Sequence, residues 1–201
     1  MTTASALSHS RQTIASYEDY ADRYCALVSD MPNAFDQTAF RRLAEIAGAG
    51  GRALEIGSGP GWDADFLETL GLTVRRTDAT KRFLELQAAR GKKGELLDVI
   101  TDPVGGPYDA VVAMCVLIHI PREEIDQVLA KLTHSLRPGG ALIVSMREGD
   151  HETTSKYHTV YWRRDDFADR LAAAGLKLVW DASDICSDGD PWNTFLAVRR
   201  D

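Results

Sequence analysis

The stretch Ala53-Leu54-Glu55-Ile56-Gly57-Ser58-Gly59-Pro60-Gly61 is the segment that decides the fold of this chain. Its apolar start predicts a short buried strand, and glycine at every second position predicts a tight turn before a helix that begins near Trp62. Glycine adopts positive φ and has no Cβ, so the backbone turns sharply and approaches a ligand closely. The free N–H groups of the following helix favour an anionic group. The stretch therefore predicts an α/β protein with a nucleotide-like cofactor.

The third glycine separates two kinds of cofactor. Dinucleotide-binding proteins carry G-x-G-x-x-G, and the last glycine lets the helix pack closely on the strand. Here Trp62 stands at that position and Gly61 comes one residue early. Glu55 lies two residues before the first glycine, where its carboxylate would repel a pyrophosphate and attract a cation. We therefore expect a positively charged ligand at this turn.

Strand-like and helix-like segments alternate along most of the remaining chain. This alternation with short turns predicts parallel strands covered by helices on both faces, and the direct loop at about 181–192 makes the last strand antiparallel. We expect an α/β, three-layer, Rossmann-like fold with a seven-stranded, mostly parallel sheet. The predicted strands cover residues 52–56, 72–77, 95–97, 109–114, 141–146, 176–180 and 194–199, and the predicted helices between them cover 62–70, 81–90, 121–136 and 164–174.

The composition is that of one globular domain spanning residues 1–201. We expect residues 1–12 to form a flexible tail without signal-peptide character, and two helices within 13–48 to cover the cofactor and substrate cleft. The net charge of −7 argues against a nucleic-acid partner, and no apolar run approaches the length of a membrane helix. Three scattered cysteines, Cys25, Cys115 and Cys186, indicate reduced thiols. We expect a cytoplasmic monomer or homodimer.

Several motifs resemble those of one enzyme family. Glu55-x-Gly57-x-Gly59-x-Gly61 resembles motif I of the class I S-adenosylmethionine-dependent methyltransferases, whose cofactor carries an ammonium and a sulfonium and no phosphate. Tyr108–Cys115 resembles motif IV, a buried strand whose end lies beside the transferable methyl group. Leu136-Arg137-Pro138-Gly139-Gly140 resembles the turn before the fifth strand. The resemblance covers roughly residues 50–147 and implies S-adenosylmethionine as cofactor.

Acidic residues follow two of the predicted strands, at the edge where ligands bind in such sheets. Asp78 comes 21 positions after Gly57, the distance at which a carboxylate accepts hydrogen bonds from both hydroxyls of a ribose. Capping of the next helix, shared with Thr80, is a compatible alternative. For Asp98 the resemblance implies a hydrogen bond to the adenine amino group, and a turn aspartate is the alternative.

The resemblance also reaches the amino-terminal helix. Tyr17-x-x-Tyr20-Ala21-x-x-x-Tyr24 resembles a segment that closes over the methionine end of the cofactor, and core aromatic residues are the alternative. Among these tyrosines we predict a contact only for Tyr24. Cys115 is expected to be a small buried residue rather than a nucleophile. The predicted cofactor-binding residues are Tyr24, Glu55, Gly57, Ser58, Gly59, Gly61, Asp78, Ala79, Leu97, Asp98, Met114 and Cys115.

Methyl transfer asks little of side chains, because the sulfonium is already activated and positioning supplies much of the rate. A general base helps only when the acceptor is protonated. His119 is the candidate catalytic base, and a histidine bonded to backbone at a helix entrance is the alternative. His151 and His158 lack a metal-ligand spacing such as H-E-x-x-H, so we predict no metal. The loops at about 148–163 and 181–192 are free to shape an acceptor pocket.

These observations favour an S-adenosylmethionine-dependent methyltransferase acting on oxygen or nitrogen of a small molecule. An NAD(P)-dependent oxidoreductase is one alternative, but it predicts glycine where Trp62 stands, and no tyrosine has a lysine four residues later. A non-catalytic cofactor-binding module is another, because fold alone does not fix function. The charge disfavours methylation of RNA or protein. The sequence does not identify the acceptor.

Overall fold

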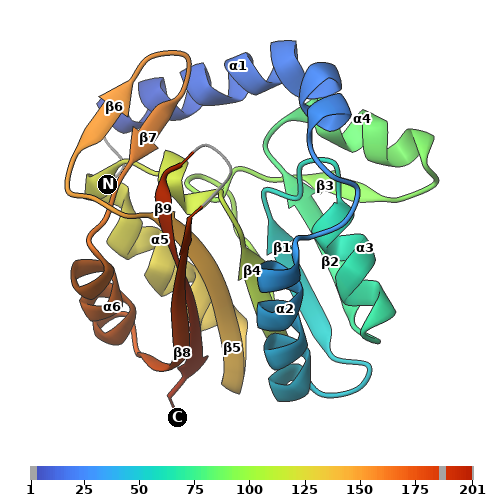
Figure 1. Cartoon of the computed structure of the whole chain (residues 1–201), viewed down its shortest axis with the longest axis vertical. Helices are drawn as coiled ribbons and strands as arrows, with labels where there is room; N and C mark the ends of the chain where they lie inside the picture. The colour runs from blue at the N-terminus through green and yellow to red at the C-terminus, as the bar shows by residue number, and fades with distance from the viewer. Residues whose placement is uncertain (1–3, 186–188, 201) are drawn as a thin grey trace.

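A seven-stranded sheet forms the middle layer, in the order β3-β2-β1-β4-β5-β9-β8 (Figure 1). It is seen in a computed structural model that describes residues 4–185 and 189–200. The strands of this sheet are β1 (Arg52–Ile56), β2 (Thr73–Asp78), β3 (Gly94–Leu96), β4 (Tyr108–Ala113), β5 (Leu136–Arg147), β8 (Leu176–Ile185) and β9 (Pro191–Arg199).

The strand directions agree with the predicted fold. β3, β2, β1, β4 and β5 pair in parallel, whereas β9 pairs antiparallel with both β5 and β8. The chain builds outward from β1 to β2 and β3, and then returns to place β4 on the other side of β1. The strand order therefore reverses between β1 and β4, and the crevice beyond their carboxyl ends is where such a sheet binds ligands.

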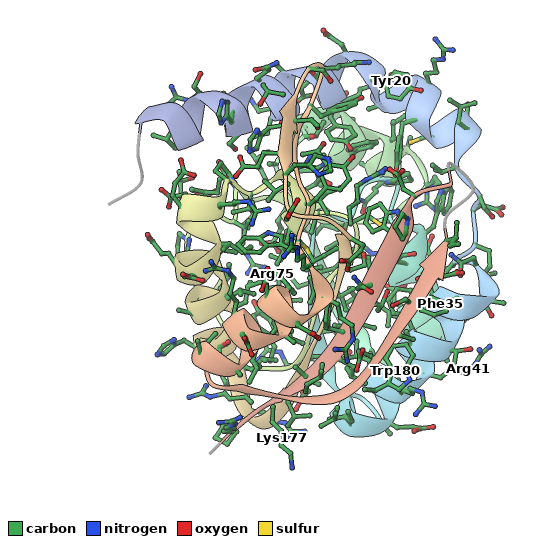
Figure 2. The ribbon with its side chains drawn as sticks, turned by 60° about the vertical axis from the view of Figure 1, so that its left-hand side comes forward. Tyr20, Phe35, Arg41, Arg75, Lys177 and Trp180 are labelled. Carbon is green, nitrogen blue, oxygen red and sulfur yellow. The ribbon has the colours of Figure 1, made fainter. Side chains whose placement is uncertain are left out.

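Two apolar cores, one on each face, hold the helices to the sheet. One core contains Phe40 and Leu67, from helices α2 and α3, and the other contains Leu129 and Phe167, from α5 and α6. The helices are α1 (Ala4–Leu27), α2 (Ala34–Ala47), α3 (Trp62–Thr69), α4 (Lys81–Ala89), α5 (Arg122–Ser135) and α6 (Arg164–Ala173), with a short 3₁₀ helix η1 (Leu117–His119). The aromatic rings of Phe35 on α2 and Trp180 on β8 meet at 6.0 Å between centroids (Figure 2).

The amino-terminal segment differs from the prediction. Residues 4–12, expected in a flexible tail, begin the long helix α1, which lies across the top of the molecule (Figure 1). Distant chain segments hold this end of the helix: Gln12 Nε2 donates to the Ser155 carbonyl at 2.6 Å, and Thr13 Oγ1 accepts from the His158 N–H at 3.0 Å. These contacts join positions more than 140 residues apart, so local sequence gave no sign of them. Residues 1–3 lie outside the described part.

Two predicted loops also contain strands. A hairpin of β6 (Glu152–Thr154) and β7 (His158–Val160) lies within 148–163, and the pairing of β8 with β9 continues to Ile185 and Pro191. Both segments are polar and lack the apolar alternation that predicts a strand. Cys186 lies outside the described residues. Within 4–185 and 189–200, no helix is both long enough and apolar enough to cross a membrane.

Candidate active site

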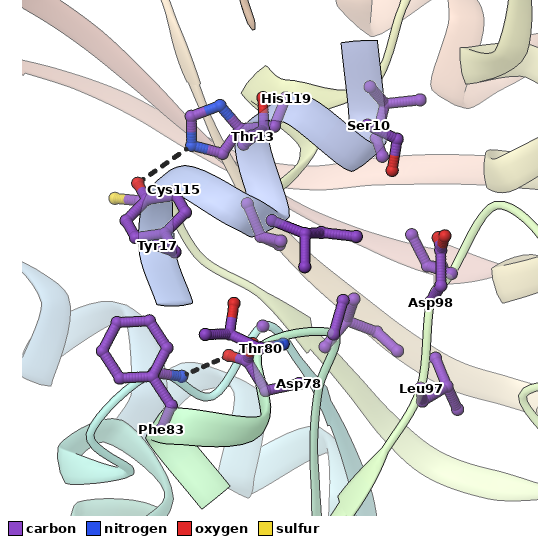
Figure 3. A pocket seen from close by; sticks show the side chains of 18 of the residues that line it. Ser10, Thr13, Tyr17, Asp78, Thr80, Phe83, Leu97, Asp98, Cys115 and His119 are labelled. Atoms are coloured by element: carbon purple, nitrogen blue, oxygen red, sulfur yellow. Dashed lines mark hydrogen bonds between the residues drawn. The ribbon is translucent and has the colours of Figure 1, made fainter. Parts of the chain in front are cut away.

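A pocket opens beyond the carboxyl ends of β1, β2 and β4 and is covered by α1 (Figures 1 and 3). It holds about 800 Å³ of space between atoms, part of it open to solvent. Of the predicted site residues, those that line this pocket are Tyr24, Gly57, Gly59, Asp78, Ala79, Leu97, Asp98, Met114, Cys115 and His119.

The glycine turn after β1 forms one wall of the pocket. Gly57 has φ of +67°, and a Cβ added there would lie 2.5 Å from Cγ2 of Val116, so only glycine fits against the segment after β4. Gly59 has φ of +51°, and a Cβ there would meet nothing within 4 Å. The turn thus leaves open space beside Gly59, which suits the close approach of a ligand to the backbone.

Asp78 at the end of β2 ties this turn to the next helix. Its Oδ2 accepts from the Gly59 N–H at 2.8 Å, and its Oδ1 accepts from the Thr80 N–H at 2.7 Å. The Thr80 side chain is a third partner of this carboxylate, which has about four lone-pair sites, so acceptor capacity remains for a ligand hydroxyl. The Thr80 side chain does not cap α4; instead the Glu18 carboxylate of α1 accepts from the N–H groups of Lys81 and Arg82. The predicted cap by Thr80 is therefore wrong, and a contact of Asp78 with a ribose stays a prediction.

Leu97 and Asp98 form another side of the pocket (Figure 3). Asp98 Oδ1 accepts from the Ile100 N–H at 2.9 Å, and the Asp98 N–H donates to Asp102 Oδ2 at 2.9 Å. Asp98 is therefore a turn aspartate, as one of the two interpretations held. Because it also lines the pocket, a contact with an adenine amino group remains a prediction.

Glu55, Ser58 and Gly61 were predicted to bind the cofactor but are not among the residues that line the pocket. Glu55 is buried and accepts a hydrogen bond from Ser58 Oγ. The Gly61 carbonyl accepts from Arg76 Nη1 at 3.1 Å at the start of α3. These bonds support the glycine turn, and contact of the three residues with the cofactor stays a prediction.

Buried carboxyl groups surround this turn. Burial, reinforced by the nearby charge of Asp63, raises the pKa of Glu55 to about 8. Burial, together with the charge of Asp36, raises the pKa of Asp63 to about 7. Burial also raises the pKa of Asp78. An added cation would stabilise the ionised form of each group, so the electrostatics favour a cationic ligand. Asp63 was missed in the sequence analysis, although an acidic residue in the first turn of α3 was visible there.

His119 lies in η1, with both ring nitrogens occupied. Nδ1 lies 2.7 Å from the His158 carbonyl oxygen, and Nε2 lies 3.1 Å from the Tyr17 hydroxyl (Figure 3). Burial lowers the pKa of His119 to about 4; the bond to the His158 carbonyl opposes this shift, and the charges of His158 and Arg147 add to it. His119 is therefore bonded to backbone, as the alternative held, and it also lines the pocket; its role as a catalytic base stays a prediction.

Tyr17 is a pocket residue that the sequence analysis did not select. Its ring packs against Tyr24, Phe83 and Tyr157, with centroid distances of 6.0, 5.9 and 4.6 Å. Burial raises the pKa of Tyr17, so its hydroxyl keeps its proton. The three- and four-residue spacing of the tyrosines on α1 was the available signal. It did not reveal which tyrosine faces His119, because that partner is 102 residues away.

Cys115 differs from the expected buried residue. It is exposed, lies on the pocket wall and has φ of +55°. Its N–H donates to Ser145 Oγ at 2.8 Å, which holds the backbone in this uncommon left-handed conformation. The sharp turn after β4 brings Met114 and Cys115 to the pocket. In the described part of the chain, no group of three or more His, Cys, Asp or Glu residues is arranged to hold a metal ion.

Parts of this chain match known methyltransferases in sequence. A family model described as a methyltransferase domain matches residues 54–142. Protein-L-isoaspartate O-methyltransferase of Chlorobaculum parvum is 32% identical over 103 residues. That alignment covers 48% of this chain and 43% of the enzyme, so the chain spans less than half the length of this relative.

Solved structures resemble the whole chain. The 1,6-didemethyltoxoflavin-N1-methyltransferase of Burkholderia thailandensis has a TM-score of 0.73 at 19% identity and covers 100% of this chain and 92% of its own. The magnesium protoporphyrin IX methyltransferase of Synechocystis PCC 6803 has a TM-score of 0.71 at 18% identity. The match covers 93% of this chain and 97% of the methyltransferase. The [4+2]-cyclase SpnF has a TM-score of 0.66 at 14% identity. The match covers 82% of this chain and 80% of the cyclase. The chain therefore resembles a methyltransferase domain over residues 54–142 and shares its overall fold with these solved structures.

Proposed function

We propose that this protein transfers a methyl group from S-adenosylmethionine to an oxygen or nitrogen atom of a small molecule. The observation that carries the proposal is that one pocket, at the point where strand order reverses, gathers the predicted residues. The glycine turn, Asp78, Asp98 and His119 all line it. Helix α1 covers it, so the space suits a small acceptor better than a macromolecule. The net charge of −7 also disfavours a nucleic acid.

The residues present fit the cofactor. Asp78 lines the pocket and keeps acceptor capacity for a ribose hydroxyl, and the open space beside Gly59 suits the amino-acid end near the buried carboxyl group of Glu55. Leu97 and Asp98 flank the position expected for adenine, and Tyr24, Met114 and Cys115 lie on the remaining wall. When bound, S-adenosylmethionine supplies an electrophilic methyl group on a sulfonium.

Two structural neighbours support a small acceptor, and the cysteine pattern supports a cytoplasmic location. These two neighbours are methyltransferases of 1,6-didemethyltoxoflavin and of magnesium protoporphyrin IX, both small molecules. We extend this kind of acceptor to the present chain. Scattered cysteines without a C-x-x-C pair support a cytoplasmic enzyme. We propose that residues 1–201 act as one domain, as a monomer or homodimer.

Calorimetric titration tests the cofactor assignment. S-adenosylhomocysteine should bind the folded protein, and Asp78→Asn should weaken binding by roughly 1–3 kcal/mol, the usual range for hydrogen bonds to a charged group. NAD⁺ should not bind. Asp150→Asn, an exposed change outside the pocket, is the matched control. Binding of NAD⁺ in place of S-adenosylhomocysteine would contradict the proposal.

Turnover needs a separate experiment, because the SpnF cyclase shows that this fold also serves a reaction other than methyl transfer. The protein is incubated with methyl-labelled cofactor and a metabolite extract, and labelled products are separated by mass. A labelled small molecule supports the proposal. Cofactor binding without any label transferred would favour the non-catalytic alternative.

A further inference from the structure

The hydrogen positions around His119 follow from its partners. The His158 carbonyl oxygen only accepts hydrogen bonds, so His119 Nδ1, 2.7 Å away, must carry the hydrogen. A neutral imidazole carries one hydrogen, which leaves Nε2 as a bare acceptor. Tyr17 must therefore donate its hydroxyl hydrogen to Nε2, at 3.1 Å. The structure thus fixes both the tautomer of His119 and the direction of the bond from Tyr17.

The direction of the hydrogen bond from Tyr17 to His119 decides which donor and acceptor atoms face the pocket. His119 Nε2 is occupied by Tyr17, so the imidazole does not meet an acceptor molecule directly. The Tyr17 oxygen has given its hydrogen to His119 and keeps its lone pairs, and Tyr17 lines the pocket. It can therefore accept a hydrogen bond and cannot donate a second one. A substrate group placed against it must bring a hydrogen of its own.

We propose that Tyr17 is the catalytic residue that contacts the methyl acceptor, that His119 acts through it as a positioning residue, and that the acceptor is a neutral hydroxyl group of an alcohol or phenol. This inference rests on the proposed function. It deepens that function by choosing oxygen over nitrogen, and it moves the contact with substrate from His119 to helix α1.

The proton balance agrees with a hydroxyl acceptor. As the acceptor oxygen forms its bond to the methyl carbon and the sulfur–carbon bond breaks, the oxygen becomes a positively charged oxonium. Its proton passes to Tyr17, while the Tyr17 proton passes to His119 Nε2. The products are a methyl ether, S-adenosylhomocysteine and an imidazolium whose Nδ1–H remains on the His158 carbonyl. Solvent then removes the proton and restores the starting state.

Other acceptors suit this pair poorly. A protonated ether is a strong acid, so a weakly basic histidine is sufficient to take its proton. An aliphatic ammonium, with a pKa of about 10, would not yield its proton to a histidine whose pKa burial has lowered to about 4. An ionised carboxylate or thiolate brings no hydrogen, so its charge would face the lone pairs of Tyr17. The pair therefore selects against these groups.

Nuclear magnetic resonance tests the hydrogen assignment without any substrate. The protein is labelled with ¹⁵N-histidine and its long-range nitrogen–proton spectrum is recorded near pH 6.5. The expected spectrum shows neutral His119 with hydrogen on Nδ1, and in Tyr17→Phe the Nε2 resonance shifts toward that of an unbonded nitrogen. Hydrogen on Nε2, or a charged ring, would overturn the proposal.

Kinetic assays test the role of Tyr17 and His119 in catalysis. They use methyl-labelled cofactor and follow the product that was identified in the metabolite extract. A methyl ether is expected, and Tyr17→Phe should lower kcat/KM at least about 100-fold. His119→Gln should cost a similar factor, and the double variant should lose little more, because the two residues act as one unit. Tyr20→Phe is the matched control, since Tyr20 lies on the same helix but does not line the pocket (Figure 2).

The outcomes separate the two proposals. If S-adenosylhomocysteine does not bind the wild-type protein, the proposed function fails. If it binds and label is transferred, but Tyr17→Phe and His119→Gln turn over like the wild type, the inference fails alone. A labelled methylamine or methyl ester as product would overturn the hydroxyl assignment. Should Tyr17→Phe not fold, the wild-type spectrum and His119→Gln still decide the question.

Discussion

At the scale of single residues, the glycine turn shows how packing and conformation act together. Gly57 combines positive φ with contact to Val116, whereas Gly59 has positive φ and open space around it. The same substitution at the two positions therefore separates the two effects.

Gly57→Ala is expected to destabilise the protein by roughly 3–4 kcal/mol, because about 1–2 kcal/mol comes from the left-handed backbone and the remainder from overpacking against Val116. Gly59→Ala should lose only the backbone contribution. Adding Val116→Ala to Gly57→Ala should recover part of the loss. Urea unfolding measures all four proteins, and equal losses at both glycines would contradict this account.

Glu55 is a residue whose charge is expected to oppose folding. Its pKa is raised from 4.5 to about 8, so between these values the folded state binds more protons than the unfolded state. The free energy of unfolding should therefore fall as pH rises through this window. Below pH 4.5 the carboxyl group is protonated in both states, and its contribution to the pH dependence vanishes.

Glu55→Gln should remove this slope and raise the free energy of unfolding at pH 8 by roughly 2–4 kcal/mol, since each pKa unit corresponds to 1.36 kcal/mol. It should also weaken binding of S-adenosylhomocysteine, whose ammonium loses a nearby negative charge. Denaturant unfolding at pH 5 and pH 8 and calorimetry provide the measurements. Glu95→Gln, an exposed residue in β3, is the control. An unchanged pH slope in Glu55→Gln would show that another group titrates.

At the scale of elements, α1 bridges two distant parts of the fold. Glu18 caps α4, Asp22 pairs with Arg82, and Gln12 reaches the turn between β6 and β7. The helix has few buried apolar residues, so these polar contacts do much to hold it above the pocket.

Glu18→Ala should therefore loosen α1 as a unit. Loss of the cap on α4 is expected to cost about 1–2 kcal/mol, as other N-cap removals do. Hydrogen exchange across residues 4–27 should accelerate, and affinity for S-adenosylhomocysteine should fall, since Tyr17 and Tyr24 line the pocket. Asp19→Ala, an exposed neighbour on the same helix, should change neither. Unchanged exchange in Glu18→Ala would mean that the remaining contacts suffice.

The elements also show what the sequence could predict. Apolar periodicity and glycine stops placed the seven main strands within a few residues, because most of them are buried or half-buried segments with a distinct pattern, whereas β3 is short and mostly exposed. The start of α1 and the hairpin of β6 and β7 depend on contacts with each other, so no local pattern revealed them. The same reason hid Tyr17, whereas Asp78 and His119 follow strand ends and were predictable.

At the scale of the whole molecule, the pocket is built from several elements of the fold. Its wall is built from the strand ends on both sides of the switch point and from α1, while the two apolar cores lie on opposite faces of the sheet. A ligand seated there would contact both halves of the sheet and the covering helix at once. Ligand binding is therefore expected to stabilise the folded molecule as one unit.

Saturating S-adenosylhomocysteine should raise the melting temperature of the whole chain. At 100 times its dissociation constant it adds about 2.7 kcal/mol to the free energy of unfolding, which corresponds to roughly 5–10 °C for a protein of this size. The shift should be larger at pH 8 than at pH 6, because the ligand ammonium favours the ionised forms of Glu55 and Asp63. Calorimetric scans at both pH values measure this, and in Glu55→Gln the difference should shrink. A larger shift at pH 6 would mean that these carboxyl groups do not face the cationic end of the ligand.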